Sequence, residues 1–295
     1  MDTFIQLFLS GISAGCVYGL VAMGFVLIYK STEVVNFSQG DLVMLGAFFA
    51  VTFSQWLNGN YWLAVVFTVM AMACLGYGVE RILFRRLMGE PPFSVLMVTI
   101  GLGFVLRAVA GMIWGHDPQS MSTPYSDARL AWGDFLLPVR DLVVIFGTLI
   151  LSVILFIFFK SSRIGLTMQA VSQNQFAAYC VGIPVKRVLA LTWALSATIA
   201  GVAGILLVPI KSAYPQLGLL LGIKAFAAAI VGGFGSLPGA LMGGLLIGVL
   251  EEMTKFYIDP VLEFGVSEFS AYILLLVILL IRPQGLITSM QRKKV

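Results

Sequence analysis

Nine long runs of apolar residues follow one another along the chain, more than a soluble domain could bury. Most of them contain the roughly 20 residues that cross a hydrocarbon core about 30 Å thick. Charged residues make up 11% of the chain, against about 25% in a soluble domain. The sequence therefore predicts an all-α polytopic membrane protein and excludes a soluble enzyme or a disordered chain. The runs span about 4–29, 34–57, 61–84, 94–114, 141–159, 188–209, 217–233, 237–257 and 266–281.

The last three runs are short or interrupted, so we expect about 8–10 transmembrane helices, some of them broken or short. The two longest polar connections lie at about 115–140 and about 160–187. Neither has the length of a typical soluble domain. Residues 1–295 are therefore predicted to form a single transmembrane domain.

Lysine and arginine gather in every second connection. If the N-terminus lies outside and the chain alternates across the bilayer, Lys30, Arg85, Lys160, Arg187 and the basic tail at 292–294 all lie inside. Basic residues are enriched in the cytoplasmic loops of membrane proteins. We therefore predict an outside N-terminus and an inside C-terminus. The net charge of +4 reflects this orientation within membrane lipid and does not indicate a nucleic-acid partner.

A polar stretch lies between the first two apolar runs. Polar groups in a membrane are unfavourable unless they face a partner or water, so this stretch could line a translocation pathway or gate. It could equally be a helix start, with Ser38 or Asn36 as its cap and Asp41 in its first turn. Both interpretations stay open at this stage. The residues of the stretch are Asn36, Ser38, Gln39, Gly40 and Asp41.

Glycines recur at four-residue spacing in two of the apolar runs. On a helix, such a spacing makes a flat groove along which another backbone can approach closely. The grooves indicate either ordinary tight packing or helices that shift between two states. The two sets are Gly11, Gly15 and Gly19, and Gly235, Gly239 and Gly243, with Gly244 and Gly248 beside the second.

The chain carries no signature of catalysis or metal binding. Cys16, Cys74 and Cys180 lack paired spacing, and we interpret them as packing residues rather than metal ligands. Neither a phosphate-binding G-x-x-x-x-G-K-[ST] loop nor an H-E-x-x-H motif occurs. We therefore expect neither enzymatic activity nor a cofactor in this chain.

Few charged residues fall inside the apolar runs. Arg107 and Lys224 do, and we interpret them as reaching toward the membrane interfaces, or else as substrate or subunit contacts. Asp41 is the one acidic residue placed to carry a proton within the membrane. The sequence therefore predicts a conduit without its own energy source; the alternative is a stand-alone ion-coupled carrier that depends on Asp41.

The connection at about 160–187, which this orientation places inside, contains a predicted helix over 167–180. The helix ends at the Gly-Ile-Pro sequence at 182–184. Its larger side chains share one face, which would rest on the membrane domain, and its small residues share the other, which would meet a cytoplasmic partner. The larger residues are Met168, Val171, Phe176 and Tyr179, and the others are Ala170, Asn174, Ala177 and Ala178.

Four sequence motifs resemble those of LivH-type permeases of branched-chain amino-acid ABC importers. The stretch NFSQGD at 36–41, followed by MLGA at 44–47, resembles the NFAHGD…MLGA segment of these permeases. FAAYCVGI at 176–183 is similar to their cytoplasmic coupling segment. VGGFGSLPGA at 231–240 is similar to the most recognisable stretch of the family, and RPQGL at 282–286 resembles its usual ending.

The resemblance implies a transmembrane permease subunit in a bacterial inner membrane. Its partners would be a second related permease, two ATPase subunits that bind ATP and Mg²⁺, and a periplasmic substrate-binding protein. The cargo would be branched-chain or related amino acids; urea or a short amide, which related permeases carry, is the alternative. The residues that would couple the permease to an ATPase are Ala170, Asn174, Ala177, Ala178, Gly182 and Ile183.

Overall fold

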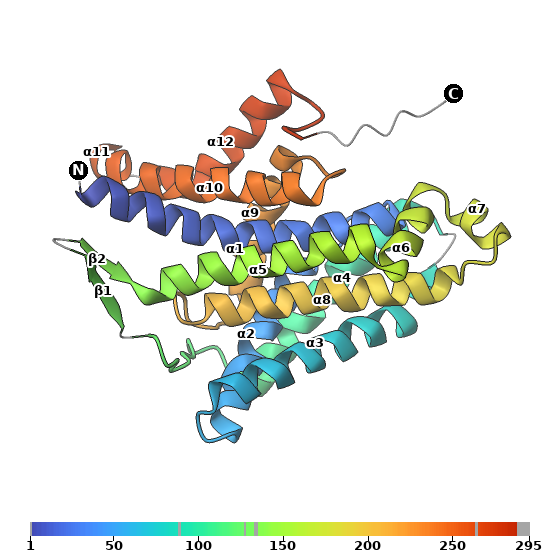
Figure 1. Cartoon of the computed structure of the whole chain (residues 1–295), viewed down its shortest axis with the longest axis horizontal. Helices are drawn as coiled ribbons and strands as arrows, with labels where there is room; N and C mark the ends of the chain where they lie inside the picture. Colours follow the sequence, from blue (N-terminus) through green and yellow to red (C-terminus); the bar gives the residue numbers. More distant parts are fainter. Residues whose placement is uncertain (1, 88–89, 127, 133–134, 263–264, 288–295) are drawn as a thin grey trace.

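The computed structural model is a bundle of helices with one small β-hairpin (Figure 1). It describes residues 2–87, 90–126, 128–132, 135–262 and 265–287. The long helices are α1 (Asp2–Thr32), α3 (Tyr61–Ile82), α4 (Pro92–Trp114), α5 (Val139–Ser161), α8 (Val185–Leu207) and α10 (Leu237–Tyr257). The shorter elements are α2 (Gln39–Trp56), η1 (Phe84–Leu87), β1 (Arg129–Trp132), β2 (Phe135–Pro138), α6 (Arg163–Gln173), α7 (Gln175–Cys180), α9 (Leu217–Gly232), α11 (Asp259–Leu262) and α12 (Val266–Ile281).

Each predicted apolar run coincides with a helix. Among the described residues, the six long helices are long and apolar enough to cross a membrane, and α9 and α12 are shorter apolar helices. The remaining run forms α2, whose polar residues, among them Gln39 and Asp41 in its first turn, keep it out of the first group. The prediction of an all-α polytopic membrane protein is confirmed.

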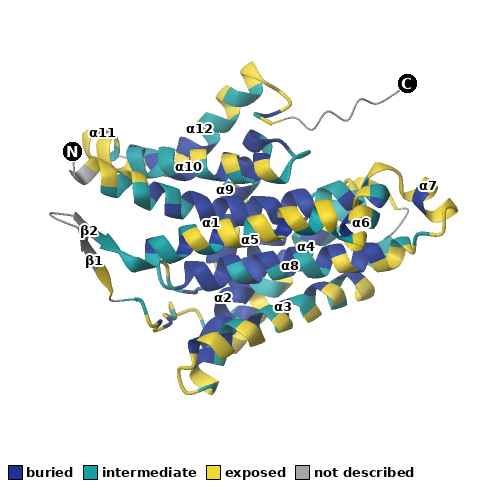
Figure 2. Cartoon of the chain, viewed as in Figure 1, coloured by how far each residue is buried: buried dark blue, intermediate teal, exposed yellow. Residues whose placement is uncertain are grey.

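The centre of the bundle is formed by α1, with α2, α8, α9 and α10 packed around it (Figure 2). In the apolar window that marks α1 as a span, 89% of residues are buried, against 17% in α4 and in α5. Helices α4 and α5 therefore present their apolar side chains outward, toward lipid or a partner, while α1 is enclosed by protein. Helix α1 therefore positions the helices that pack on it, α2, α8, α9 and α10.

The long connection between α4 and α5 contains regular structure. It contains the antiparallel hairpin β1–β2, in which Arg129 pairs with Pro138, and a bridge joins Gln119 to Ala213 in the α8–α9 link. The Tyr125 and Tyr61 hydroxyls lie 2.8 Å apart, and burial raises the pKa of Tyr125. These contacts hold the α4–α5 connection against the start of α3 and the link that follows α8.

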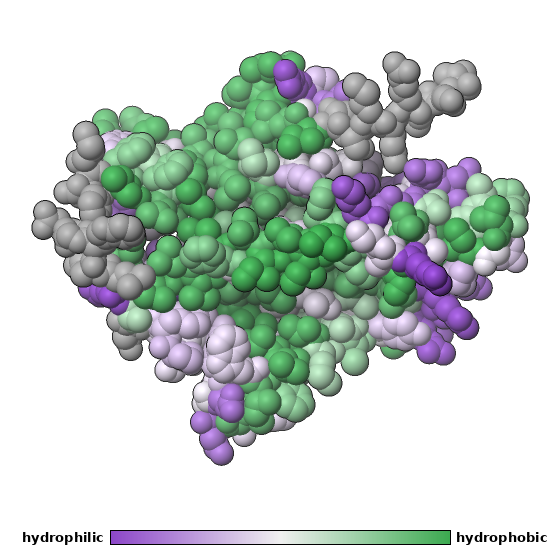
Figure 3. All heavy atoms as spheres, viewed as in Figure 1, coloured by the Kyte–Doolittle hydropathy of each residue, from purple (hydrophilic) through white to green (hydrophobic). Residues whose placement is uncertain are grey.

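One end of the molecule differs in chemistry from its flank. Helices α6 and α7 lie at one end and the hairpin at the other (Figure 1). Hydrophilic side chains gather at the α6–α7 end, whereas the flank between the ends is hydrophobic (Figure 3). This distribution fits helices that cross a bilayer from end to end. The predicted basic tail at 292–294 lies outside the described residues.

Candidate functional site

The polar stretch at 36–41 lies inside the bundle. Asn36, Ser38 and Gln39 are 0% exposed and Asp41 is 2% exposed. Helix α2 begins at Gln39 with Ser38 as its N-cap residue, so the predicted helix start is observed. The cap itself is different: the Ser38 hydroxyl donates to Asn36 Oδ1 at 2.6 Å and makes no bond to the helix. Asn36 Oδ1 also accepts from the Ser38 N–H, at 3.1 Å.

Gln39 and Ser196 together join three helices. Its Nε2 donates to the backbone oxygen of Ser196 on α8 at 3.3 Å. The Ser196 hydroxyl lies 3.0 Å from Gln39 Oε1 and 3.0 Å from the backbone oxygen of Gly24 on α1. Gly24 leaves the room that this arrangement needs, because an added methyl group there would lie 2.9 Å from Gln39 Cδ. The first turn of α2 is thus bonded to α8, and Ser196 also bonds α8 to α1.

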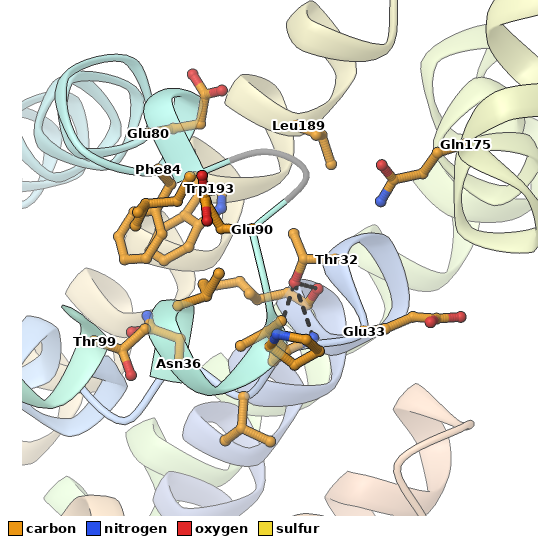
Figure 4. A pocket seen from close by; sticks show the side chains of 16 residues that line it. Thr32, Glu33, Asn36, Glu80, Phe84, Glu90, Thr99, Gln175, Leu189 and Trp193 are labelled. Atoms are coloured by element: carbon orange, nitrogen blue, oxygen red, sulfur yellow. Dashed lines mark hydrogen bonds between the residues drawn. The ribbon is translucent and has the colours of Figure 1, made fainter. Parts of the chain in front are cut away.

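Asn36 also borders a pocket of about 220 Å³ at the α6–α7 end of the bundle (Figure 4). Phe84 and Trp193 stack in its wall, with ring centroids 4.1 Å apart. Gln175 reaches the pocket from α7, and its Nε2 donates to the backbone oxygen of Ser31 at 2.8 Å. The pocket therefore lies where the polar stretch, the end of α1 and α7 come together. Glu80, at its edge, pairs with Arg85 at 3.2 Å.

Asp41 forms an ion pair across two helices. Its Oδ1 lies 2.9 Å from Arg107 Nε on α4, and the Arg107 guanidinium lies 4.7 Å from the centre of the Phe104 ring. Arg107 also donates to the backbone oxygen of Gly103 at 3.3 Å. The expectation that Arg107 reaches for the membrane interface is therefore replaced by a structural pairing with Asp41. A charge in the membrane needs such a partner.

Lys224 is also paired rather than directed toward an interface. Its Nζ lies 2.6 Å from Glu251 Oε1 on α10, and their side chains are 15% and 13% exposed. The Tyr18 hydroxyl on α1 donates to Glu251 Oε2 at 2.9 Å. This cluster ties α1, α9 and α10 together, as the Gln39 contacts tie α1, α2 and α8.

The helix predicted to couple the permease to an ATPase is two helices, not one. The predicted helix over 167–180 is interrupted at Asn174, whose backbone is extended (φ −161°, ψ 108°). The Asn174 side chain accepts from the Ala177 N–H at 2.9 Å and so caps α7. Asparagine is among the preferred capping residues, which is why the chain turns here. The prediction of one continuous helix was wrong.

The break also changes which side chains face the bundle. Met168 and Val171 are buried against α8 as predicted, but Phe176 and Tyr179 are 77% and 71% exposed. Ala178, which was predicted to face a partner, is buried beside Val188. Of the remaining coupling candidates, Asn174, Ala177 and Gly182 are exposed, and Ala170 and Ile183 are half-buried.

The glycines of α1 lie against α10. An added methyl group would meet the Val249 backbone at Gly11 and the Leu245 backbone at Gly15, at 2.8 and 2.7 Å. The facing glycines are Gly244 and Gly248, whose added methyl groups would overlap the backbones of Gly19 and Gly15.

The second predicted glycine set lies elsewhere. Gly239 and Gly243 face the α9 backbone, at Gly232 and Ala228, and Gly235 is in the turn before α10. Gly40 lies against α9 as well, because an added methyl group would come 2.7 Å from Gly222 Cα.

Three residues of these clusters were not predicted: Ser196, Tyr18 and Glu251. Ser196 lies in an apolar run, 157 positions from Gln39, and serine is common in such runs as a packing residue. Tyr18 is separated from Glu251 by 233 positions. The only available signal was the location of Lys224 inside an apolar run, which implies a partner but does not identify it. Among the described residues, no group of three His, Cys, Asp or Glu side chains is placed to hold a metal ion.

A family model described as branched-chain amino acid transport system / permease component matches residues 7–282. The chain belongs to this permease family. The permease is thus a multi-pass membrane protein that serves in transport.

Two relatives match the permease over nearly its full length. The high-affinity branched-chain amino acid transport system permease protein LivH of Salmonella typhimurium is 28% identical over 99% of this chain and 98% of its own. The corresponding protein BraD of Pseudomonas aeruginosa is 29% identical, with the same coverage. A solved structure, PsaBC from Streptococcus pneumoniae in complex with Fab, covers 95% of this chain and 91% of its own with a TM-score of 0.50. At 17% identity it shows a similar fold only.

Proposed function

We propose that this permease is the membrane-spanning subunit of an ATP-driven ABC importer for branched-chain or related amino acids. Its partners are a second related permease, two ATPase subunits that bind ATP and Mg²⁺, and a periplasmic substrate-binding protein. Family membership supports this assignment, as do the relatives named for branched-chain amino acid transport. The chain lacks a phosphate-binding loop of the G-x-x-x-x-G-K-[ST] type, so the energy comes from the ATPases.

The observation that carries the proposal is the α6–α7 segment. It lies at one end of the bundle (Figure 1), with Asn174, Ala177 and Gly182 exposed and its opposite side buried against the ends of α5 and α8. An exposed, structured segment of this kind can be bound by an ATPase. In our proposal it is the coupling segment of the importer.

Movement of the coupling segment reaches the centre of the bundle through direct contacts. Gly165 of α6 lies so close to α5 that an added methyl group would come 2.7 Å from Phe159 Cα. Val171 and Ala178 pack in one cluster with Val188 of α8. Eight residues further along α8, Ser196 contacts Gln39 at the start of α2. ATP binding would thus shift the coupling helices, and α8 would carry the shift to the polar stretch, which we assign to the pathway or its gate.

We further propose a bacterial inner-membrane location, with the N-terminus outside and the C-terminus inside. The hairpin end then faces the periplasm and the binding protein. The α6–α7 end faces the cytoplasm and the ATPases, in keeping with its hydrophilic side chains (Figure 3).

The alternative of a stand-alone ion-coupled carrier depends on Asp41. A proton-coupled carrier needs an acid that gains and loses a proton during transport. Asp41 lies 2.9 Å from Arg107; this pairing favours the charged carboxylate, whereas burial opposes it, so accumulation of leucine by the chain without ATPases is the test of the alternative. A urea or short-amide importer of the same architecture differs from our proposal only in cargo, which uptake competition distinguishes.

The test is uptake of labelled leucine by the full complex in sealed vesicles, with ATP on the ATPase side. We predict that Ala177→Arg lowers uptake by about tenfold or more, because an unpaired charge pressed into a packed interface costs several kcal/mol. Ala177→Ser is the matched control and retains uptake, and both variants insert into the membrane. Wild-type uptake by Ala177→Arg, or accumulation of leucine by the chain without ATPases, would overturn the proposal.

A further inference from the structure

A second, larger pocket of about 500 Å³ lies at the same end of the bundle, on the other side of α1. Its walls come from the ends of α1 and α5, from α6, and from the turn before α10. Part of the lining is apolar and includes Leu27, Phe156 and Phe159. The rest is mostly polar and carries two lysines, Lys30 and Lys160, with no carboxylate among the lining residues. The pocket is therefore amphipathic and positively charged.

The two lysines have no anion in the described part of the chain. Of the three ion pairs found there, none includes Lys30 or Lys160. Lys30 is half-buried, and a partly desolvated ammonium is favourable only beside a negative charge. Lys160 lies 6.0 Å from the centre of the Phe156 ring, a contact that leaves its charge unneutralised. An anion in this pocket would serve both ammonium groups at once.

Two further features favour a phosphate group that arrives from the bilayer. The N-terminus of α10 contributes Ser236, Leu237 and Pro238 to the wall, and the positive end of the helix dipole favours an anion there. Phe156 is 54% exposed on α5, one of the outward-facing helices (Figure 2). A lipid can therefore enter sideways, with its upper acyl chain along the apolar wall. Basic pockets between transmembrane helices are suited to acidic lipid headgroups.

We propose that this pocket binds the headgroup of an anionic phospholipid. The phosphate lies between Lys30 and Lys160, and the upper acyl chain lies against Phe156 and Phe159. The bound lipid joins α1, α5 and α6 at the base of the coupling segment. This inference depends only on the pocket and the surrounding membrane, so it stands apart from the identity of the transported substrate.

The test uses the full-length chain, with the subunits that co-purify, in nanodiscs of phosphatidylcholine with a minor share of phosphatidylglycerol. Mass spectrometry measures the phosphatidylglycerol retained after exchange into detergent. Lys30→Gln and Lys160→Gln are each expected to lower retention about fivefold, since one basic side chain near a lipid surface contributes on the order of that factor. The double variant loses more than either. Lys186→Gln is the matched control, because Lys186 is exposed at the same end and outside the pocket.

A second measurement separates binding from folding. Added phosphatidylglycerol is expected to raise the thermal midpoint of the wild type but not of the double variant, while both have the same midpoint in phosphatidylcholine alone. Unchanged retention in the double variant, or an equal loss in Lys186→Gln, would overturn the proposal. Displacement of the lipid by millimolar inorganic phosphate would identify a free-anion site instead. Retention that changes only when the ATPases are removed would assign the lysines to a protein contact.

Discussion

At the scale of single residues, polar side chains inside the bundle are joined in pairs across helices. Gln39 with Ser196 and Asp41 with Arg107 are two such pairs, and each joins segments far apart in the sequence. The sequence predicted that residues 36–41 either line a pathway or begin a helix, because polar groups in an apolar setting need a partner. It could not predict the partners, since a lone serine or arginine in an apolar run does not specify which helix lies opposite.

Replacing Ser196 with alanine should destabilise the bundle. Ser196→Ala removes the hydroxyl that faces Gln39 Oε1 and the Gly24 backbone oxygen, and a buried polar group left unpaired costs about 1–3 kcal/mol. Thr198→Ala on the same helix is the control, because its hydroxyl donates only to Ala194 within α8. The thermal midpoint of each variant is measured by unfolding in detergent and compared with that of the wild type. Equal midpoints for the two variants would contradict the assignment.

The Lys224–Glu251 pair should behave as a unit. Lys224→Met leaves the Glu251 carboxylate, 13% exposed, without its cation, whereas Lys224→Met with Glu251→Gln removes both charges. Breaking one side of a buried ion pair costs about 3–5 kcal/mol, and partial exposure reduces that figure. We expect the double variant to be more stable than the single variant by about 1–3 kcal/mol. Additive losses in a double-mutant cycle would show that the pair does not couple.

At the scale of helices, the apolar runs predicted where the membrane helices lie, but the sequence did not show where the helix between two of them is interrupted. The helix expected over 167–180 is divided because the Asn174 side chain caps α7. Asparagine is compatible with a helix face and with a helix start, and only its tertiary setting decides between them. Burial of Ala178 rather than Phe176 follows from that break. In the same way, four-residue glycine spacing predicted close packing in α1 without showing that Gly244 and Gly248 lie opposite.

Close packing of α1 on α10 gives a prediction with an internal control. Gly248→Ala would place a methyl group into the Gly15 backbone, and such overpacking costs about 1–3 kcal/mol. At Gly101 on α4 an added methyl group meets nothing within 4 Å, so Gly101→Ala should stay within about 1 kcal/mol of the wild type. Denaturant or thermal unfolding distinguishes the two. An equally small loss of stability in Gly248→Ala would mean that α1 and α10 can move apart to accommodate the methyl group, and would contradict the prediction.

At the scale of the whole molecule, the enclosed helix α1 and the exposed α6–α7 segment are connected through α8. Helix α1 contacts both polar clusters, through Gly24 and through Tyr18, and α8 runs from the coupling segment past Gln39. The all-α membrane architecture was predictable because nine apolar runs leave few other folds. The central position of α1 was not, because α4 and α5 are at least as apolar, and hydropathy does not distinguish a lipid-facing helix from an enclosed one.

The proposed orientation has a direct test in the native cysteines. Cys180 is exposed at the end of α7, Cys16 is buried, and Cys74 is exposed but lies within the span of α3. A membrane-impermeant maleimide should therefore label Cys180 alone, in inside-out vesicles and not in right-side-out ones, when the chain is expressed without ATPases. Cys180→Ser should abolish the labelling. Co-expression of the ATPases should reduce it, because the coupling segment would then be covered, whereas labelling of Cys180 from the outside would reverse the topology and remove the basis for ATPase contact at α7.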